Sequence, residues 1–180
     1  SVAEQAVFLM LACARRFNYV DRQFRAGNYK IRFSLDNTFE LKGKTLGLLG
    51  CGRIGQLLAG IAKNGFGMNV IGYDPFLKQE QIGDLITLIP EQEEIFKQAD
   101  FVSIHTPLLP STYHSVGMKQ LKMMKPTASL INASRGEVVH EEELIQAMKE
   151  GVIACAGLDV TEKEPLPLDR PLYELDNVIL

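Results

Sequence analysis

Residues 50–55 of this 180-residue chain form a glycine-rich turn whose spacing could bind a phosphate group. They read Gly-Cys-Gly-Arg-Ile-Gly, which fits the pattern G-x-G-x-x-G. Gly50 allows a sharp turn, Gly52 leaves room for a pyrophosphate because it has no Cβ, and Gly55 lets a following helix pack closely on a sheet. A helix that begins here offers unpaired N–H groups and the positive end of its dipole, and both attract phosphate.

The segments on either side of this turn supply the context that the motif requires. An apolar run at 45–49 predicts a strand before the turn, and apolar residues at helical spacing predict a helix after it. A second apolar run at 68–73 closes on Asp74, about 20 residues beyond Gly55. There the Asp74 carboxylate can accept hydrogen bonds from an adenosine ribose, while its charge would repel a 2′-phosphate. The five parts together predict a dinucleotide site that favours NAD over NADP.

The composition limits the classes of protein to which the chain can belong. A hydrophobic fraction of 46% is ample for a packed core, and 180 residues are the size of one domain. The net charge of −3, with scattered Lys and Arg, predicts neither a nucleic-acid partner nor binding to an anionic membrane. The apolar run at 6–14 is too short to span a bilayer and no basic segment precedes it, as a signal peptide would require. Three cysteines without a C-x-x-C pair favour reduced thiols and a cytoplasmic location, and we expect no metal site.

Strands and helices are expected to alternate along the chain. Ser1 and Glu4 form a capping box that opens a widely buried helix, which we expect to run to about Arg25. Further strands are predicted at 85–89, 101–104, 128–132, 153–159 and 177–180, and helices or short helical pieces at 75–83, 91–99, 111–122 and 141–149. Because the strands are continuous apolar runs, we predict an α/β fold: a Rossmann-type doubly wound parallel sheet with helices on both faces, in three layers. We expect residues 1–180 to be one domain from a longer chain, since position 1 is not Met and the last residues read as a strand that has just begun.

Polar and charged residues gather where the predicted strands end. Besides the glycine turn and Asp74, they are His105-Thr106-Pro107, Ala133-Ser134-Arg135-Gly136, and Asp159 followed by Glu164. Any one of them could be a solvated loop residue. In an open α/β sheet, however, ligands bind at the carboxyl ends of the strands, so strand ends that point the same way predict one shared site.

In these motifs the sequence resembles the cofactor-binding domain of the D-isomer-specific 2-hydroxyacid dehydrogenases. The segments that carry the resemblance span nearly the whole chain in the family's order: SVAEQ, GCGRIG, GYDP, HTPLLPST, MMKPTASLINASRGEVV and AGLDVTEKEPLP. HTPLLPST together with GYDP is most similar to the D-3-phosphoglycerate dehydrogenase branch. For the cofactor, the resemblance implies that Arg53 and Ile54 contact the pyrophosphate and that Asp74 contacts the adenine ribose. It further implies that Asp159 contacts the carboxamide. The nicotinamide side would be lined by Thr106, Ala133, Ser134 and Arg135.

The resemblance also implies two catalytic roles. Arg135 would bind the substrate carboxylate with its planar fork and polarise the C2 carbonyl. Glu164 would pair with a catalytic histidine and raise its pKa, and that histidine would take the hydroxyl proton as hydride passes to the nicotinamide. In the family this histidine follows the strand that begins at Asn177, and a smaller substrate-binding domain precedes Ser1. We therefore expect the 180 residues alone to bind cofactor without turnover.

Three histidines lie at other positions in the sequence. His105 belongs to a strand-end motif, and we expect a structural role for it. His114 follows a short turn and is expected at the surface. His140 precedes the acidic run 141–143, where it could cap a helix.

The function implied by the resemblance is hydride transfer between NAD and a 2-hydroxy or 2-keto acid, first as a D-3-phosphoglycerate dehydrogenase of serine biosynthesis. Glyoxylate or hydroxypyruvate reduction is an alternative, because contacts to a substrate phosphate would lie largely in the other domain. An NAD-binding transcriptional corepressor of the same fold is another alternative. A methyltransferase with a Rossmann domain is disfavoured by Asp74 and by the order of the later motifs. The family commonly dimerises through this domain, so the apolar opening helix is expected to support a homodimer.

Overall fold

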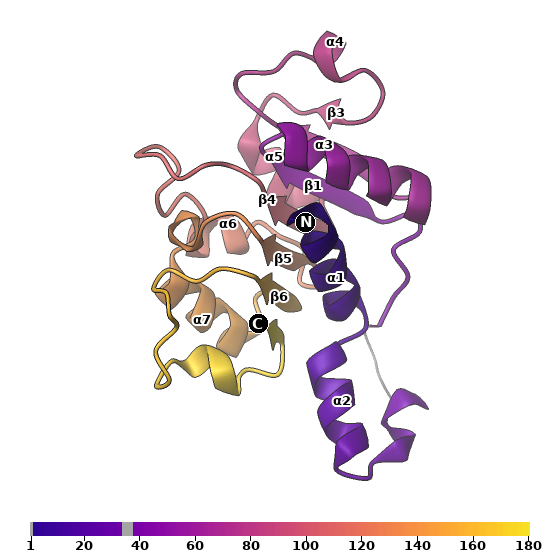
Figure 1. Ribbon diagram of the computed structural model, residues 1–180, viewed down its shortest axis with the longest axis vertical. Coiled ribbons are helices and arrows are strands. Elements are labelled where there is room, and N and C mark those ends of the chain that lie inside the picture. The colour runs from indigo at the N-terminus through magenta and orange to yellow at the C-terminus, as the bar shows by residue number, and fades with distance from the viewer. Residues whose placement is uncertain (1, 34–37) are drawn as a thin grey trace.

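The computed structural model describes residues 2–33 and 38–180, and its centre is a parallel sheet covered by helices (Figure 1). The sheet has seven strands in the order β3-β2-β1-β4-β5-β6-β7, and every neighbouring pair is parallel. The strands are β1 Thr45–Leu49, β2 Asn69–Tyr73, β3 Thr87–Leu88, β4 Phe101–Ile104, β5 Ser129–Asn132, β6 Cys155–Leu158 and β7 Val178–Ile179. The capping box expected at Ser1 lies outside the described residues.

Helices cover both faces of this sheet, which confirms the predicted three-layer arrangement. They are α1 Val2–Ala14, α2 Phe17–Arg25, α3 Arg53–Gly60, α4 Gln79–Ile82, α5 Gln92–Gln98, α6 Met118–Leu121 and α7 Glu141–Glu150. Short helical turns are η1 Tyr29–Phe33, η2 Ile61–Gly65, η3 Gly136–Val138 and η4 Pro171–Glu174. The apolar residues of α1 and α3 form one buried cluster with the sheet, and those of α5, α6 and α7 form a second cluster on the other face. None of the helices in the described ranges combines the length and apolar character that crossing a membrane requires.

The alternation of side chains along β1 shows how the sequence builds these two cores. Leu46 and Leu48 are fully buried in the cluster of α1 and α3, while Leu49 is buried in the opposite one. Gly47 faces α5, where an added Cβ would lie 2.7 Å from the Cγ2 atom of Ile95. Each buried leucine contributes roughly 1.5–3 kcal/mol, and the glycine allows α5 to approach the strand closely.

The order of the strands creates a crevice between β1 and β4. The chain moves outward from β1 to β2 and β3, then returns to place β4 on the other side of β1. This reversal is a topological switch point, where the loops that follow the two strands diverge. The glycine turn follows β1 and Thr106 follows β4, so the fold places both at the mouth of this crevice.

The expected single helix from Ser1 to about Arg25 is wrong, because the chain breaks between α1 and α2. Arg16 adopts a left-handed conformation with φ 50° and ψ 45°, which an α-helix cannot contain. The break lets α2 leave the sheet, as Figure 1 shows, and no residue of α2 is fully buried. Side chains then tie α2 to the end of the chain: Asn18 donates to the carbonyl of Val178 at 2.7 Å.

Other elements are shorter than the sequence indicated. The strand expected at 85–89 keeps only the two residues of β3 in the sheet, where it pairs with β2 alone at the edge. The helical pieces expected at 111–122 are reduced to α6.

The helix after the glycine turn continues beyond α3 as a π-helical turn, η2. It ends before Gly67, which has a positive φ of 64°.

Candidate functional site

The glycine turn between β1 and α3 has the geometry that its sequence predicts. Gly50 has a φ of +90°, and a Cβ on it would lie 2.8 Å from the carbonyl oxygen of His105. A Cβ on Gly55 would lie 2.6 Å from the carbonyl oxygen of Gly50, so α3 packs directly on the turn. Gly52 differs from both, because a Cβ there would meet nothing within 4 Å. The open space at Gly52 is where the predicted pyrophosphate would lie.

The first turn of α3 leaves its N-terminal donors available. Gly52 occupies the N-cap position, and no side chain caps the helix there. Arg53 and Ile54 follow on the exposed surface, while Gly55 is buried. Backbone N–H groups at a helix start have no partner within the helix, so this end can receive an anion.

Asp74 connects the end of β2 to the glycine turn. Its Oδ2 atom accepts a hydrogen bond from the backbone N–H of Cys51 at 2.9 Å, and its Oδ1 atom accepts one from Phe76 at 2.9 Å. Each carboxylate oxygen keeps a second lone pair for a ribose hydroxyl. Phe76 beside it is 84% exposed, which leaves this edge of the site open. Burial, with the Asp74 charge adding to it, raises the pKa of the Cys51 thiol to about 12, so Cys51 is not a nucleophile near neutral pH.

The ends of β4 and β5 are joined by a hydrogen bond between two predicted cofactor residues. The Ser134 hydroxyl donates to the carbonyl of Thr106. His105, just before it, pairs through Nε2 with the Ser103 hydroxyl at 2.9 Å. Burial lowers the pKa of His105 to about 4, so its ring is neutral near pH 7. These contacts agree with the structural role expected for His105.

Asn132 organises the turn that carries Ala133, Ser134 and Arg135, although no sequence motif predicts a role for it. It is buried at the end of β5, where its Nδ2 group donates to the carbonyl of Arg135 at 2.9 Å and its Oδ1 atom accepts from the N–H of Ser134 at 3.1 Å. A polar residue at the end of a mainly apolar strand was the signal that could have revealed it. Arg135 is exposed and uses one donor on the carbonyl of Ser134 at 2.8 Å, which leaves most of its guanidinium free for a carboxylate.

Arg135 and Glu164 line the same cavity, of about 500 Å³, together with Ser134 and Thr161 among others. The two loops that carry them touch, since a Cβ on Gly136 would lie 1.9 Å from the carbonyl oxygen of Thr161. Glu164 is exposed and accepts a hydrogen bond from the N–H of Thr161 at 3.2 Å. The cavity therefore combines a cation suited to a carboxylate with an acid suited to proton transfer.

Asp159 does not line this cavity. Although it follows β6 as expected, it is exposed, and its Oδ1 atom accepts a hydrogen bond from the side chain of Gln5 in α1 at 2.9 Å. Gln5 lies 154 residues away in the sequence, so no local pattern could have paired the two.

A comparison with known proteins identifies the family of the chain. The family model described as "D-isomer specific 2-hydroxyacid dehydrogenase, NAD binding domain" matches residues 7–180. The chain belongs to this family. It is 43% identical to a glyoxylate reductase of Korarchaeum cryptofilum over 182 residues, covering 100% of this chain and 54% of that protein. It is 45% identical to a D-3-phosphoglycerate dehydrogenase of Methanocaldococcus jannaschii over 181 residues, covering 99% of this chain and 34% of that protein.

The structures of this dehydrogenase family agree with the observed fold. The structure of D-lactate dehydrogenase with NAD⁺ from Lactobacillus jensenii matches with a TM-score of 0.89 and 35% identity, over 99% of this chain and 56% of that one. The chain thus spans between a third and about half of the length of these relatives.

The residues of this NAD-binding domain fit their cofactor. The cradle at Gly52 is open, the start of α3 has no side-chain cap, and Asp74 stands at the end of β2 next to both. Within the described residues, no group of three or more His, Cys, Asp or Glu side chains is placed to hold a metal ion. The individual cofactor contacts remain predictions.

Two histidines of the dehydrogenase domain behave differently from the sequence expectation. His114 is half-buried: its Nε2 atom pairs with Glu162 Oε1 at 2.8 Å. Its ring stacks on Tyr113 at a centroid distance of 4.0 Å and contacts the tilted ring of His140 at 4.4 Å. His140 occupies the N-cap position of α7 but makes no side-chain cap hydrogen bond, so the expected capping role is wrong. Glu162 accepts the N–H of Glu141 instead.

Proposed function

We propose that the protein carrying this domain transfers hydride between NAD and a D-2-hydroxy or 2-keto acid. The observation that supports this proposal most is the shared cavity of Arg135 and Glu164, next to the Ser134–Thr106 hydrogen bond at the mouth of the crevice. The bound nicotinamide supplies the hydride acceptor or donor. Arg135 binds the substrate carboxylate and polarises the carbonyl at C2, because its fork matches a carboxylate and its charge is permanent. Glu164 stabilises the protonated, charged form of a catalytic histidine, which lies outside the described residues.

The cofactor part of the proposal concerns the discrimination between NADH and NADPH. The Asp74 carboxylate is held by two backbone donors at the end of β2, which supports the proposal that its charge repels a 2′-phosphate. Calorimetric titration of the purified chain with each dinucleotide tests this, and the absence of Trp rules out tryptophan fluorescence as a substitute. We expect binding of NADH and much weaker binding of NADPH. Equal affinity for the two would refute the role of Asp74.

For the substrate, we propose 3-phosphoglycerate in serine biosynthesis first and glyoxylate second. The motifs HTPLLPST and GYDP support the first, together with the 45% identity to a D-3-phosphoglycerate dehydrogenase. Relatives named glyoxylate reductase, at 41–46% identity, support the second. Initial rates of NADH oxidation by the intact protein with 3-phosphohydroxypyruvate, hydroxypyruvate and glyoxylate would rank the substrates. Absence of turnover with all three would contradict the proposed reaction on this substrate class.

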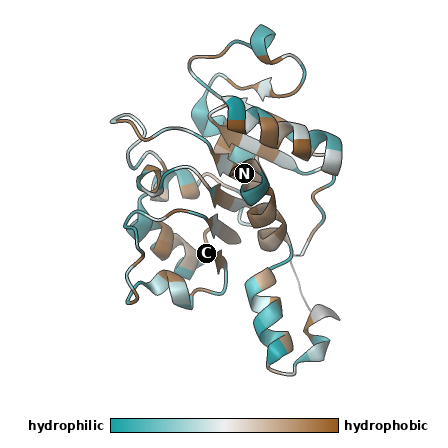
Figure 2. Ribbon diagram, viewed as in Figure 1, coloured by the Kyte–Doolittle hydropathy of each residue, from teal (hydrophilic) through white to brown (hydrophobic). Residues whose placement is uncertain are grey.

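We also propose that the chain is one of two domains, that it functions in the cytoplasm and that it forms a homodimer. The greater length of its relatives supports the first point, and three free cysteines support the second. The homodimer is supported by apolar side chains exposed on two adjacent helices: Val2, Phe8 and Leu11 on α1, and Ile54 and Leu57 on α3. Figure 2 shows hydrophobic residues along both helices. Exposed apolar clusters of this kind mark protein interfaces.

A further inference from the structure

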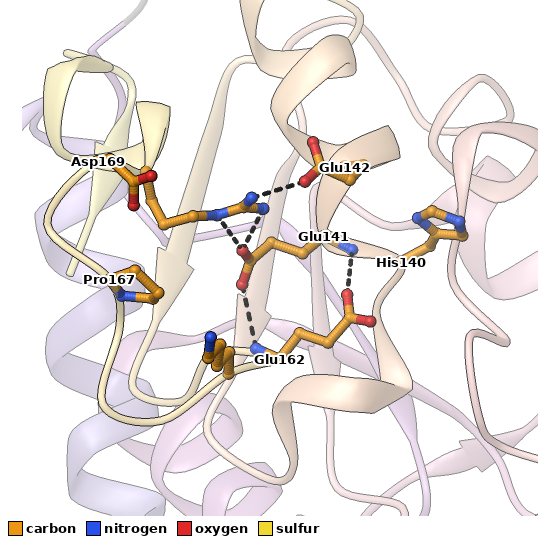
Figure 3. Close-up of a pocket in the computed structure, with 8 residues that line it drawn as sticks. His140, Glu141, Glu142, Glu162, Pro167 and Asp169 are labelled. Atoms are coloured by element: carbon orange, nitrogen blue, oxygen red, sulfur yellow. Dashed lines mark hydrogen bonds and ion pairs between the residues drawn. The ribbon is translucent and has the colours of Figure 1, made fainter.

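The loop 161–170 carries Glu164, and one buried carboxylate holds it at both ends. This carboxylate belongs to Glu141, the first residue of α7, which is only 5% exposed. Its Oε2 atom accepts a hydrogen bond from the backbone N–H of Glu162 at 3.0 Å. Its Oε1 atom accepts two from Arg170, from Nε at 3.0 Å and from Nη2 at 2.6 Å. Figure 3 shows these hydrogen bonds of the Glu141 carboxylate as dashed lines. In the sequence, Glu164 therefore lies between two anchor points, Glu162 and Arg170, that the same side chain holds.

Burial makes Glu141 dependent on these partners. A carboxylate removed from water is costly unless donors replace the lost hydration. The N–H of Glu162 and two donors of Arg170 provide that replacement. Arg170 also pairs with Glu142, from Nη1 to Oε1 at 2.6 Å, but the Glu142 side chain is 64% exposed. Glu142 thus shares Arg170 with Glu141 without contributing to the buried contact with the loop.

The side chain of Glu162 also forms a hydrogen bond to α7. Its Oε2 atom accepts a hydrogen bond from the N–H of Glu141 at 3.1 Å, which satisfies a donor in the first turn of the helix. Its Oε1 atom pairs with His114 at 2.8 Å, and the His114 ring rests on His140. Figure 3 shows Glu141 and Glu162 joined by both of their reciprocal hydrogen bonds. The loop is consequently tied to α7 and, through His114, to the segment that follows β4.

We propose that Glu141 and Glu162 are positioning residues that fix the loop presenting Glu164 beside Arg135. Gly136 supports this assignment, because its contact with the carbonyl of Thr161 lets any displacement of the loop alter the cavity that both residues line. The inference rests on the proposed function, since the placement of Glu164 affects turnover only if Glu164 acts on a catalytic histidine.

Hydrogen–deuterium exchange and kinetics of the intact protein test the proposal together. In Glu141→Ala and Glu162→Ala, we expect amide exchange in peptides covering 161–170 to rise by about tenfold. We expect kcat/KM to fall by about tenfold, with the affinity for NADH unchanged, which also shows that the variants are folded. The pKa of the histidine limb in the pH profile of kcat/KM should fall, because a displaced Glu164 no longer stabilises the charged imidazole. A purely structural role would not move that pKa.

Two matched variants serve as controls. Glu142→Ala removes the other carboxylate on Arg170 and should leave exchange and kcat/KM near wild type. Glu162→Gln should rescue much of the loss in Glu162→Ala, because its amide oxygen can accept the N–H of Glu141 while its NH₂ group donates to an unprotonated His114. Equal effects of Glu141→Ala and Glu142→Ala would overturn the assignment to the buried pair.

The two readouts separate this inference from the proposed function. Unchanged exchange of 161–170 in Glu141→Ala would overturn the anchoring, whatever the activity. Increased exchange with unchanged kcat/KM and an unchanged pH profile would overturn the positioning role while the dehydrogenase function stands. Absence of turnover by the wild-type protein would refute the proposed function and the catalytic part of the inference, and exchange would still decide whether the two carboxylates anchor the loop.

Discussion

At the scale of single residues, one glycine of the cofactor turn is required for folding and another is available for binding. Gly50 is required by the backbone, because its φ of +90° and the nearby His105 carbonyl exclude a side chain. Gly52 has an ordinary φ of −70° and open space around its missing Cβ. The fold therefore does not need glycine at position 52, and the proposed pyrophosphate contact provides a reason for it.

We expect Gly52→Ala to change cofactor affinity and not stability. The melting temperature should stay within about 2 °C of wild type, while the dissociation constant for NADH should rise by about tenfold or more. Gly60→Ala in α3 is the matched control, since its Cβ also meets nothing within 4 Å. It should gain about 0.5–1 kcal/mol of stability without affecting NADH. Circular dichroism and calorimetric titration would measure both effects, and tight NADH binding by Gly52→Ala would contradict a pyrophosphate at this position.

Asp74 allows a second test at this scale. In Asp74→Asn we expect the preference for NADH over NADPH to fall by about tenfold, because the charge that repels a 2′-phosphate is removed. The variant should also lose about 1 kcal/mol of stability, since one amide oxygen cannot fully replace two oxygens bonded to Cys51 and Phe76. Glu150→Gln makes the same charge change on α7, and its cofactor preference should equal that of wild type. Titration of both variants with the two dinucleotides would show whether the preference depends on position 74.

At the scale of elements, the sequence predicted the helices and strands that depend on the local pattern of apolar residues. The strands 45–49 and 101–104 were predicted to the residue, because short, mainly apolar runs define buried parallel strands. The break at Arg16 was missed because an arginine in a left-handed conformation has no sequence signal, unlike a glycine. In the site, the family resemblance predicts roles for Arg135 and Glu164, which line one cavity. The contacts of Asn132 and Glu162 depend on partners that only the folded chain brings near.

The pair of helices α1 and α3 supports a test of the proposed homodimer. Phe8 is 51% exposed and Leu57 is 53% exposed, so replacing either with Glu should cost little in the monomer and place a charge in the proposed interface. We expect Phe8→Glu and Leu57→Glu to sediment as monomers at concentrations where the wild type sediments as a dimer. Leu168→Glu, at a side chain 91% exposed on the loop before η4, should remain dimeric. A monomeric wild type at high concentration would refute the dimer.

At the scale of the whole molecule, the buried His105 makes stability depend on pH. Its pKa is about 4 in the folded chain, against 6.5 for an ordinary histidine, because burial disfavours the charged ring. The unfolded chain therefore binds more protons between these two values, and stability decreases as pH falls from 6.5 towards 4.

We expect this one group to remove about 2 kcal/mol of unfolding free energy between pH 7 and pH 4.5. In His105→Gln, which can keep a hydrogen bond to Ser103, that component should disappear and the pH dependence should become flatter by the same amount. Urea unfolding midpoints of both proteins at the two pH values would measure the difference. Equally steep curves for variant and wild type would show that His105 is not the group responsible.

The placement of α1 has a consequence for the order in which the chain can mature. This helix is made before β5, β6 and β7, yet it packs on all three, and its Gln5 side chain donates a hydrogen bond to Asp159. At ribosomal rates of roughly 5–20 residues per second, the helix waits on the order of 10–30 seconds for these strands. During that interval its apolar side chains, Leu9 and Met10 among them, lack the strands that complete their burial. The newly made helix α1 is therefore the part of this domain that a ribosome-associated chaperone would be expected to bind.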